Sequence, residues 1–115
     1  TSPEANALQW LDPSQTNDKK HPFLLTQGQA ILTRSYIPIQ DTPSIRITYD
    51  AKVKVPKGLM ALMSAINPKE KSEDGIYTFK MPQPIAPYLV ALAVGDVEYQ
   101  SIDNRTGNCC RKIVR

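Results

Sequence analysis

The clearest pattern in the chain is a strict alternation of apolar and polar residues over residues 45–55. Every odd position of this segment is aliphatic or aromatic, and every even position is polar or charged. Because successive side chains of a β-strand point to opposite faces, the pattern predicts a strand with one buried and one solvated face. Lys52 and Lys54 then lie on the solvated face, and Pro56 with Gly58 predicts a turn after the strand.

Shorter segments predict further β structure around this strand. Strands are expected at residues 7–11, 59–66, 76–81 and 96–100, an extended segment at 23–29, and one or two helical turns at 30–36. Residues 88–94 are apolar on both faces, which is typical of a central buried strand. The fold class is therefore expected to be all-β, mostly an antiparallel sheet or sandwich. The residues expected to be largely buried are Ile47, Tyr49, Val53, Tyr77, Phe79, Leu89, Ala91 and Val94.

The 115 residues suffice for one small domain. We expect a disordered tail at residues 1–6, a single β domain at 7–107 and an atypical basic tail at 108–115. That last segment holds the adjacent Cys109 and Cys110, which are a poor disulfide staple. Its simplest interpretation is a solvated or disordered tail. A segment foreign to the domain, arising from a frame change or a truncation, is the alternative.

Composition excludes several classes of protein. With 41% hydrophobic residues the chain is not wholly disordered, and a net charge of +3 is too mild to indicate nucleic-acid binding. No apolar run is long enough to cross a membrane and no secretory signal is evident, so we expect a cytoplasmic protein without membrane partners. His21 is the only histidine, which excludes any two-histidine metal site within the chain. We expect His21 to lie in a polar surface loop.

Several stretches together resemble one known family. ALQWL at 7–11, HPFLLTQGQAILTRSYIPIQDTPS at 21–44, LMALMSA at 59–65 and PYLVALAVGDVE at 87–98 resemble the gluzincin zinc aminopeptidases of the membrane alanyl type. Within that family they resemble the branch of leukotriene A(4) hydrolase and bacterial cold-active aminopeptidases. The resemblance covers roughly residues 7–107. It implies the later half of a saddle-like, mostly antiparallel N-terminal domain.

The resemblance also implies an activity that this chain by itself is not expected to have. Family members remove N-terminal residues from peptides with a zinc ion held by HExxH and a downstream glutamate, and a GxMEN loop grips the substrate. Neither motif occurs in this sequence. The chain is therefore expected to be a non-catalytic fragment with no catalytic residue, metal ligand or cofactor of its own. Zinc and peptide substrate belong to the parent enzyme, whose entrance this domain would help to shape.

Gln27 and Gln29 are the candidate binding residues. If their segment is extended, they project to the same side, and Gly28 between them permits close approach of a ligand or another backbone. From the residues alone, bonds to neighbouring strands or water are the favoured explanation, since glutamine is mostly a surface residue. The resemblance implies substrate binding, because Gln29 stands where many family members have a glutamate that binds the free α-amino group. It assigns Arg34 and Asp41 a supporting role, as an ion pair or turn bond that fixes the segment.

Two other functions remain open from the sequence. One is a stand-alone β-sandwich module for binding or assembly without peptidase chemistry, and the other is a small basic β protein that binds nucleic acid. The resemblance also implies that the chain lacks its catalytic domain and the earlier half of its sheet. Unpaired strand edges would follow, so we expect a homodimer or larger assembly through strand edges or an exchanged segment.

Overall fold

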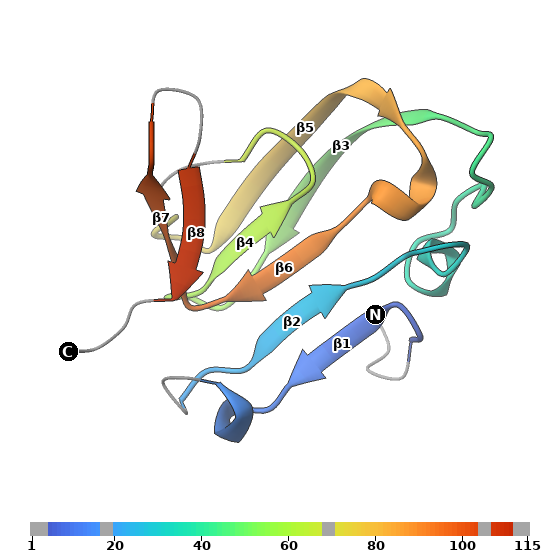
Figure 1. The fold of residues 1–115 in the computed structure, drawn as a ribbon. Helices are drawn as coiled ribbons and strands as arrows, with labels where there is room; N and C mark the ends of the chain where they lie inside the picture. Colours follow the sequence, from blue (N-terminus) through green and yellow to red (C-terminus); the bar gives the residue numbers. More distant parts are fainter. Residues whose placement is uncertain (1–4, 17–19, 68–70, 104–106, 112–115) are drawn as a thin grey trace.

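The computed structural model describes residues 5–16, 20–67, 71–103 and 107–111. Their regular structure consists of strands and single 3₁₀ turns, and none of them forms an α-helix (Figure 1). The strands are β1 (Leu8–Leu11), β2 (Phe23–Thr26), β3 (Ile47–Lys54), β4 (Met60–Met63), β5 (Ile76–Ile85), β6 (Leu92–Gly95), β7 (Val97–Ser101) and β8 (Gly107–Arg111). The turns are η1 (Pro13–Gln15), η2 (Thr33–Ser35) and η3 (Pro87–Leu89). The predicted all-β, mostly antiparallel fold is confirmed.

The strands form a four-stranded sheet in the order β1-β2-β6-β4 and two separate pairs, β3-β5 and β7-β8. Every pairing among them is antiparallel. The predicted strand at 45–55 appears as β3, and its alternation of half-buried and exposed residues runs without a break. A bridge between Ile66 and Lys80 joins the end of β4 to β5. The four-stranded sheet and the β3-β5 pair are therefore linked along one side.

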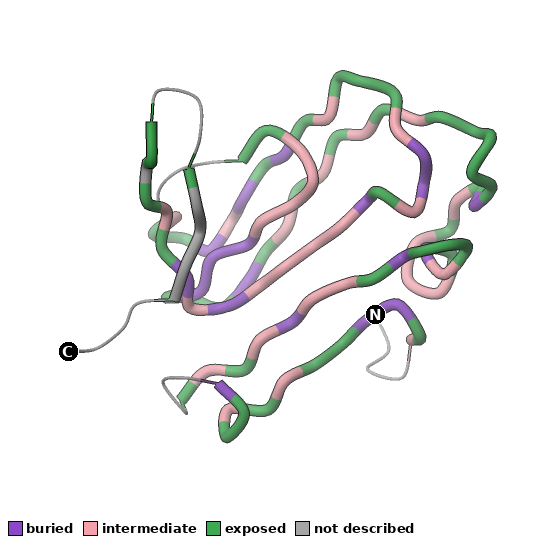
Figure 2. The backbone as a smooth tube through the Cα atoms, in the orientation of Figure 1, coloured by how far each residue is buried: buried purple, intermediate pink, exposed green. Residues whose placement is uncertain are grey.

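The core lies where β4, β5 and the end of β3 meet (Figure 2). Its buried members are Val55, Leu59, Met60, Ala61, Tyr77, Phe79 and Val97. Tyr77 is 2% exposed, and its hydroxyl donates to the Leu59 carbonyl at 3.0 Å. The aromatic residues of β5 thus tie the two-stranded pair to the chain that enters β4.

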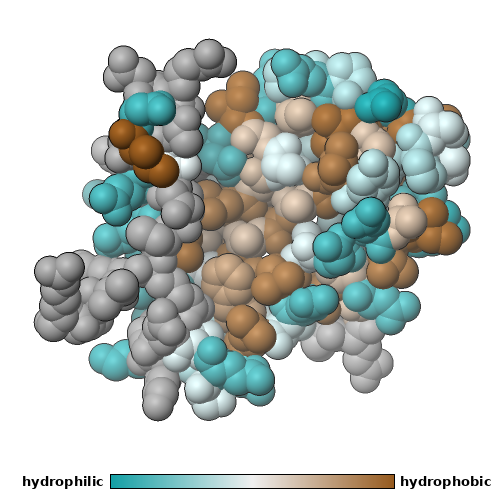
Figure 3. All heavy atoms as spheres, viewed as in Figure 1, coloured by the Kyte–Doolittle hydropathy of each residue, from teal (hydrophilic) through white to brown (hydrophobic). Residues whose placement is uncertain are grey.

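The opposite side of this arrangement is open. Figure 1 shows β1 and β2 at the end of the four-stranded sheet, with β6 and β4 between them and the β3-β5 pair. Trp10, Leu24 and Val94 share the face that is turned toward β3, because Trp10 pairs with Leu24 and Leu24 with Val94. Leu25, Ala93 and Leu62 lie on the other face and are only half-buried. Hydrophobic residues accordingly gather on the side of the molecule seen in Figure 3.

The structure corrects the predicted burial in one place. Tyr77 and Phe79 are buried as expected, whereas Ile47, Tyr49, Val53, Ala91 and Val94 are half-buried. Leu89 is 46% exposed, so its predicted burial is wrong. The reason is that Pro87 begins η3, in which Val90 N donates to the Pro87 carbonyl, and the strand starts only at Leu92. The segment at 88–94 is thus a turn followed by a strand.

Both ends of the chain also differ from expectation. At Ala5 and Asn6 the expected disordered tail is instead a turn before β1, in which Leu8 N donates to the Ala5 carbonyl at 3.0 Å. Within the tail predicted at 108–115, residues 108–111 are not disordered but belong to β8, which is Gly107–Arg111. Cys109 and Cys110 lie opposite Tyr99 and Glu98 of β7. Backbone pairing to an open strand edge needs no apolar pattern, which is why the pattern did not predict it. Residues 1–4 and 112–115 lie outside the described residues.

Candidate functional site

The candidate glutamines lie where the chain leaves β2 and enters a turn, in which Leu32 N donates to the Gly28 carbonyl at 2.9 Å. The strand ends at Thr26, and Gln27 N extends its ladder by donating to the Ala7 carbonyl at 2.9 Å. The segment expected to be extended over 23–29 is thus a strand only over Phe23–Thr26, and the turn begins at Gln29. Gln27 and Gln29 are both exposed, while Gly28 between them is buried. We call Gln27, Gly28 and Gln29 the glutamine turn.

The two glutamine side chains differ in what they offer a ligand. Gln27 Oε1 accepts a hydrogen bond from Gln29 N at 3.1 Å, so its acceptor is used within the turn. Its NH₂ group remains as a donor. A glutamine amide carries both donors and an acceptor. The side chain of Gln29 forms no hydrogen bond with another described residue. The turn therefore presents a donor at Gln27 and both functions at Gln29.

A buried threonine holds the glutamine turn against the segment that contains η3. Thr33 is 0% exposed, and its hydroxyl donates to the Pro87 carbonyl at 3.0 Å. A Cβ atom on Gly28 would collide with the Thr33 hydroxyl and lie 3.3 Å from the Tyr88 carbonyl oxygen. Gly28 is thus required for close packing rather than for a left-handed backbone, which among the described glycines occurs at Gly58 and Gly75.

Arg34 and Asp41 close the loop that follows the turn. Asp41 Oδ2 accepts hydrogen bonds from Arg34 N at 2.9 Å and from Arg34 Nε at 3.5 Å. Arg34 Nη2 donates to the Asp41 carbonyl at 2.8 Å. The Asp41 side chain is 1% exposed and that of Arg34 is 57% exposed. The contacts include both the ion pair and the turn bond considered from the sequence. A role of this pair in binding by the glutamine turn stays a prediction.

Tyr36 packs beside the same elements and was not found by sequence reasoning. Its hydroxyl donates to the Val90 carbonyl at 2.9 Å. Burial raises the pKa of Tyr36, and a hydrogen bond with Thr26 opposes that shift. The side chain therefore serves as a neutral donor at neutral pH. Neither Tyr36 nor Thr33 carries a sequence signal, because their partners lie 54 residues away.

His21 takes part in a small charged cluster away from the glutamine turn. Lys71 Nζ lies 2.6 Å from Asp96 Oδ1, and His21 Nδ1 lies 4.0 Å from Asp96 Oδ2. The cluster joins the loop before β2 to the junction of β6 and β7. Its contacts are those of a structural link between surface segments.

With this geometry established, comparison with known proteins identifies the family. Residues 6–89 match the model of the peptidase M1 N-terminal domain. The chain belongs to that family. The match spans both the glutamine turn and the Arg34–Asp41 pair, and it confirms the resemblance found in the sequence.

Individual relatives agree with this assignment. Leukotriene A-4 hydrolase of Xenopus laevis is 51% identical over an alignment of 111 positions, which covers 92% of this chain and 18% of that protein. Aminopeptidase B of Rattus norvegicus is 44% identical over 90% of this chain and 16% of its own length. The native leukotriene A4 hydrolase structure of Saccharomyces cerevisiae superposes with a TM-score of 0.82 at 36% identity, covering 93% of this chain and 16% of that one. The chain thus spans less than a fifth of the length of these relatives.

A zinc ion does not fit the residues of the described part of the chain. Its His, Cys, Asp and Glu residues nowhere form a group of three or more that could hold a metal ion. A zinc site needs three or four such ligands. The same described residues contain no helix with the length and hydrophobicity needed to span a bilayer.

Proposed function

We propose that this chain is a non-catalytic part of the N-terminal domain of a zinc aminopeptidase that removes N-terminal residues from peptides. Residues 7–107 form its single β domain, and the catalytic domain and the zinc ion belong to the rest of the parent enzyme. The parent works in the cytoplasm, where the adjacent Cys109 and Cys110 need not form a disulfide. The proposal rests on the membership of the peptidase M1 N-terminal domain family.

The contribution of this domain is to shape the substrate entrance through the glutamine turn. The observation that carries this step is an exposed pair of amides on a turn whose centre is buried. Such a turn holds its hydrogen-bonding groups in place before a ligand arrives, which lowers the entropy lost on binding. Gln29 supplies a donor and an acceptor for the peptide end, and Gln27 supplies a donor. Arg34 and Asp41 keep the following loop closed.

Replacing Gln29 by alanine in the parent enzyme is expected to lower kcat/KM for an aminoacyl-nitroanilide by about tenfold or more, because a hydrogen bond to a charged substrate group is lost. Gln29→Glu should lower KM, since a carboxylate forms a charge-assisted bond with the α-amino group. The exposed Gln83 of β5 provides the matched control, and Gln83→Ala should stay within about twofold. Unchanged kinetics in Gln29→Ala would contradict the binding role.

The 115-residue chain alone should release no product.

The isolated chain should also form a homodimer through the edge of β1. This strand ends the four-stranded sheet, and among the described strands only β2 pairs with it. An open strand edge beside half-buried Leu25 and Ala93 is a template for a second copy. Sedimentation equilibrium over a wide concentration range should show a mass above 12.8 kDa at high concentration. Gln9→Lys, which charges the exposed face of β1, should weaken the dimer, and Gln83→Lys should not. A constant mass of one chain at all concentrations would refute the predicted homodimer.

A further inference from the structure

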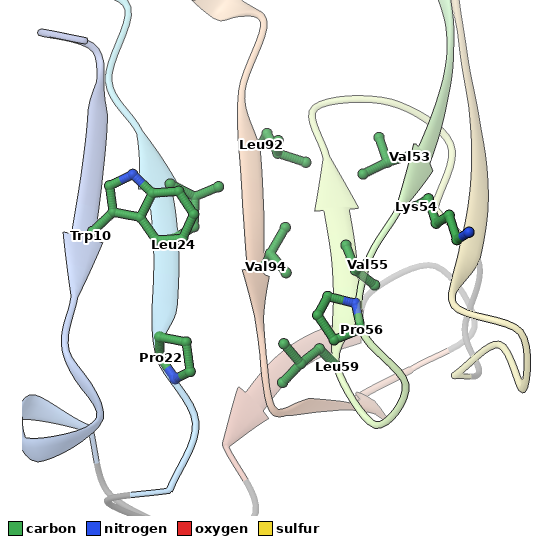
Figure 4. Close-up of a pocket in the computed structure, with 10 residues that line it drawn as sticks. All are labelled: Trp10, Pro22, Leu24, Val53, Lys54, Val55, Pro56, Leu59, Leu92 and Val94. Atoms are coloured by element: carbon green, nitrogen blue, oxygen red, sulfur yellow. The ribbon is translucent and has the colours of Figure 1, made fainter. Parts of the chain in front are cut away.

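An apolar pocket lies between the overhanging strands β1 and β2 and the end of β3. Its volume is about 310 Å³, and Figure 4 shows side chains of Trp10, Leu24, Leu92 and Val94 on one side of it and Val53 and Val55 on the other. No β5 residue lines the pocket. The pocket therefore occupies the place where the β3-β5 layer stops and the four-stranded sheet continues.

Among the described strands β3 pairs only with β5, so its other backbone edge is open along the pocket. Val55 N donates to the Gly75 carbonyl at 2.8 Å, so Val55, and by the two-residue period Val53 and Ala51, direct their backbone groups toward β5. The Lys80 carbonyl accepts from Ile66 N at 3.1 Å and thus points away from β3. Asp50 lies opposite Lys80, so its own backbone groups point away from β5. The N–H and C=O groups of Asp50, Lys52 and Lys54 therefore face the open edge.

The charge on the solvated face of β3 indicates what would fit there. Asp50 lies opposite Lys80, but Lys52 lies opposite Thr78 and Lys54 opposite Ile76. Both lysines are exposed, and no ion pair of either with a described residue is recorded. A strand added beside β3 would place every second residue next to these lysines and the residues between them over the pocket.

We propose that the open edge of β3 binds an extended polypeptide segment in which acidic residues alternate with apolar ones. The segment adds an antiparallel strand, as in every pair formed by the described strands. Its apolar side chains cover Trp10 and Leu24, and its acidic side chains pair with Lys52 and Lys54. Lysines at an open edge disfavour pairing with most strands. Here Lys52 and Lys54 would therefore favour a strand that carries acidic residues opposite them.

A second copy of the chain does not suit this edge. Pairing two β3 strands about a two-fold axis would place both four-stranded sheets on the same side of the new sheet. In each copy Trp10 of β1 and Leu24 of β2 already line the pocket beside Val53 of β3. The two sheets would then occupy the same volume. A single extended strand has no such layer attached to it.

The test uses Trp10 as the reporter, because it is the only tryptophan and is 47% exposed in the pocket. The probe is a capped nine-residue peptide in which glutamate alternates with valine and leucine. We expect a saturable blue shift of the Trp10 emission as the segment covers the ring. The same peptide with lysine in place of glutamate should not produce the shift.

Two matched comparisons separate strand addition from general hydrophobic binding. In the antiparallel register the glutamate amides face β3, so N-methylation of those amides should abolish binding, whereas N-methylation of the apolar residues should preserve it. Lys52→Glu should weaken binding by about fivefold or more, and Lys80→Glu, the same charge change on the strand away from the edge, should change it less than about twofold. Circular dichroism checks that both variants remain folded.

Several results would overturn the proposal. Binding that ignores the position of N-methylation would show that the backbone edge of β3 is not used. Equal binding of the lysine peptide would remove the charge argument, and absence of binding by any peptide would refute the site. Because a dimer formed through β1 would itself shift the Trp10 emission, the titrations are made at concentrations where sedimentation shows a single chain. A peptide-induced shift that disappears under those conditions would show that a second copy covers the pocket instead.

Discussion

Replacing Phe79 by alanine is expected to lower the free energy of unfolding by about 3–5 kcal/mol. Phe79 is 2% exposed in β5 and lies opposite Ala51 of β3. It belongs to the core cluster with Tyr77 and Met60. Alanine at this position removes most of a buried ring and leaves a cavity that the small neighbours cannot fill. A domain of this size is commonly stable by only about 5–15 kcal/mol, so the variant should lose a large share of its stability.

The neighbouring residue gives a matched control for this change. Thr78 is exposed on the solvated face of the same strand, and Thr78→Ala should alter the free energy of unfolding by less than about 1 kcal/mol. Urea unfolding followed by circular dichroism measures both variants against the parent chain. If Phe79→Ala were no more destabilising than Thr78→Ala, the β3-β5 pair would not be packed on the core as described.

The local pattern predicted the strands that have one wet face. In β3 the alternation of apolar and polar residues extends over the whole strand, and the observed burial follows it residue by residue. The strand at Val97–Ser101 was likewise predicted by a short alternation of apolar and polar residues. Such segments are predictable because a single physical requirement, one buried face, determines the sequence.

Other segments depend on distant partners and were mispredicted or missed. The apolar run at 88–94 contains no signal that Pro87–Leu89 forms a 3₁₀ turn, and the exposed Leu89 resembles a core residue in the sequence. β8 pairs with β7 through backbone groups that every sequence possesses. Neither the pairing of β8 nor the open edge of β3 can be derived from residue periodicity, because both depend on which strands meet in space.

In the candidate site, too, local features were predicted from the sequence and contacts between distant residues were not. The sequence indicated Gln27 and Gln29 through their chemistry and the family resemblance, and the same resemblance implied the Arg34–Asp41 contact. It did not indicate that Thr33 seals the turn against Pro87. That contact joins residues 54 positions apart, so only the folded chain could reveal why a glycine is needed at position 28.

Enlarging residue 28 and shrinking residue 33 are expected to have effects on the free energy of unfolding that do not add when the two changes are combined. Gly28→Ala should destabilise the chain by about 1–3 kcal/mol, because the new methyl group collides with the Thr33 hydroxyl and a backbone carbonyl. Thr33→Ala should cost a similar amount of about 1–3 kcal/mol, since the Pro87 carbonyl loses its buried donor.

The double variant Gly28→Ala with Thr33→Ala should be more stable than the sum of the two single effects predicts, by about 1–3 kcal/mol. The methyl group introduced at position 28 then occupies the space that the hydroxyl leaves, although the Tyr88 carbonyl oxygen at 3.3 Å keeps the fit tight. Thr33→Ser serves as the control, because serine retains the hydroxyl and should give no rescue of Gly28→Ala. The measurement is a double-mutant cycle of urea unfolding. Additive effects would mean that Thr33 does not limit the space at Gly28, and the glutamine turn would then owe its position to other contacts.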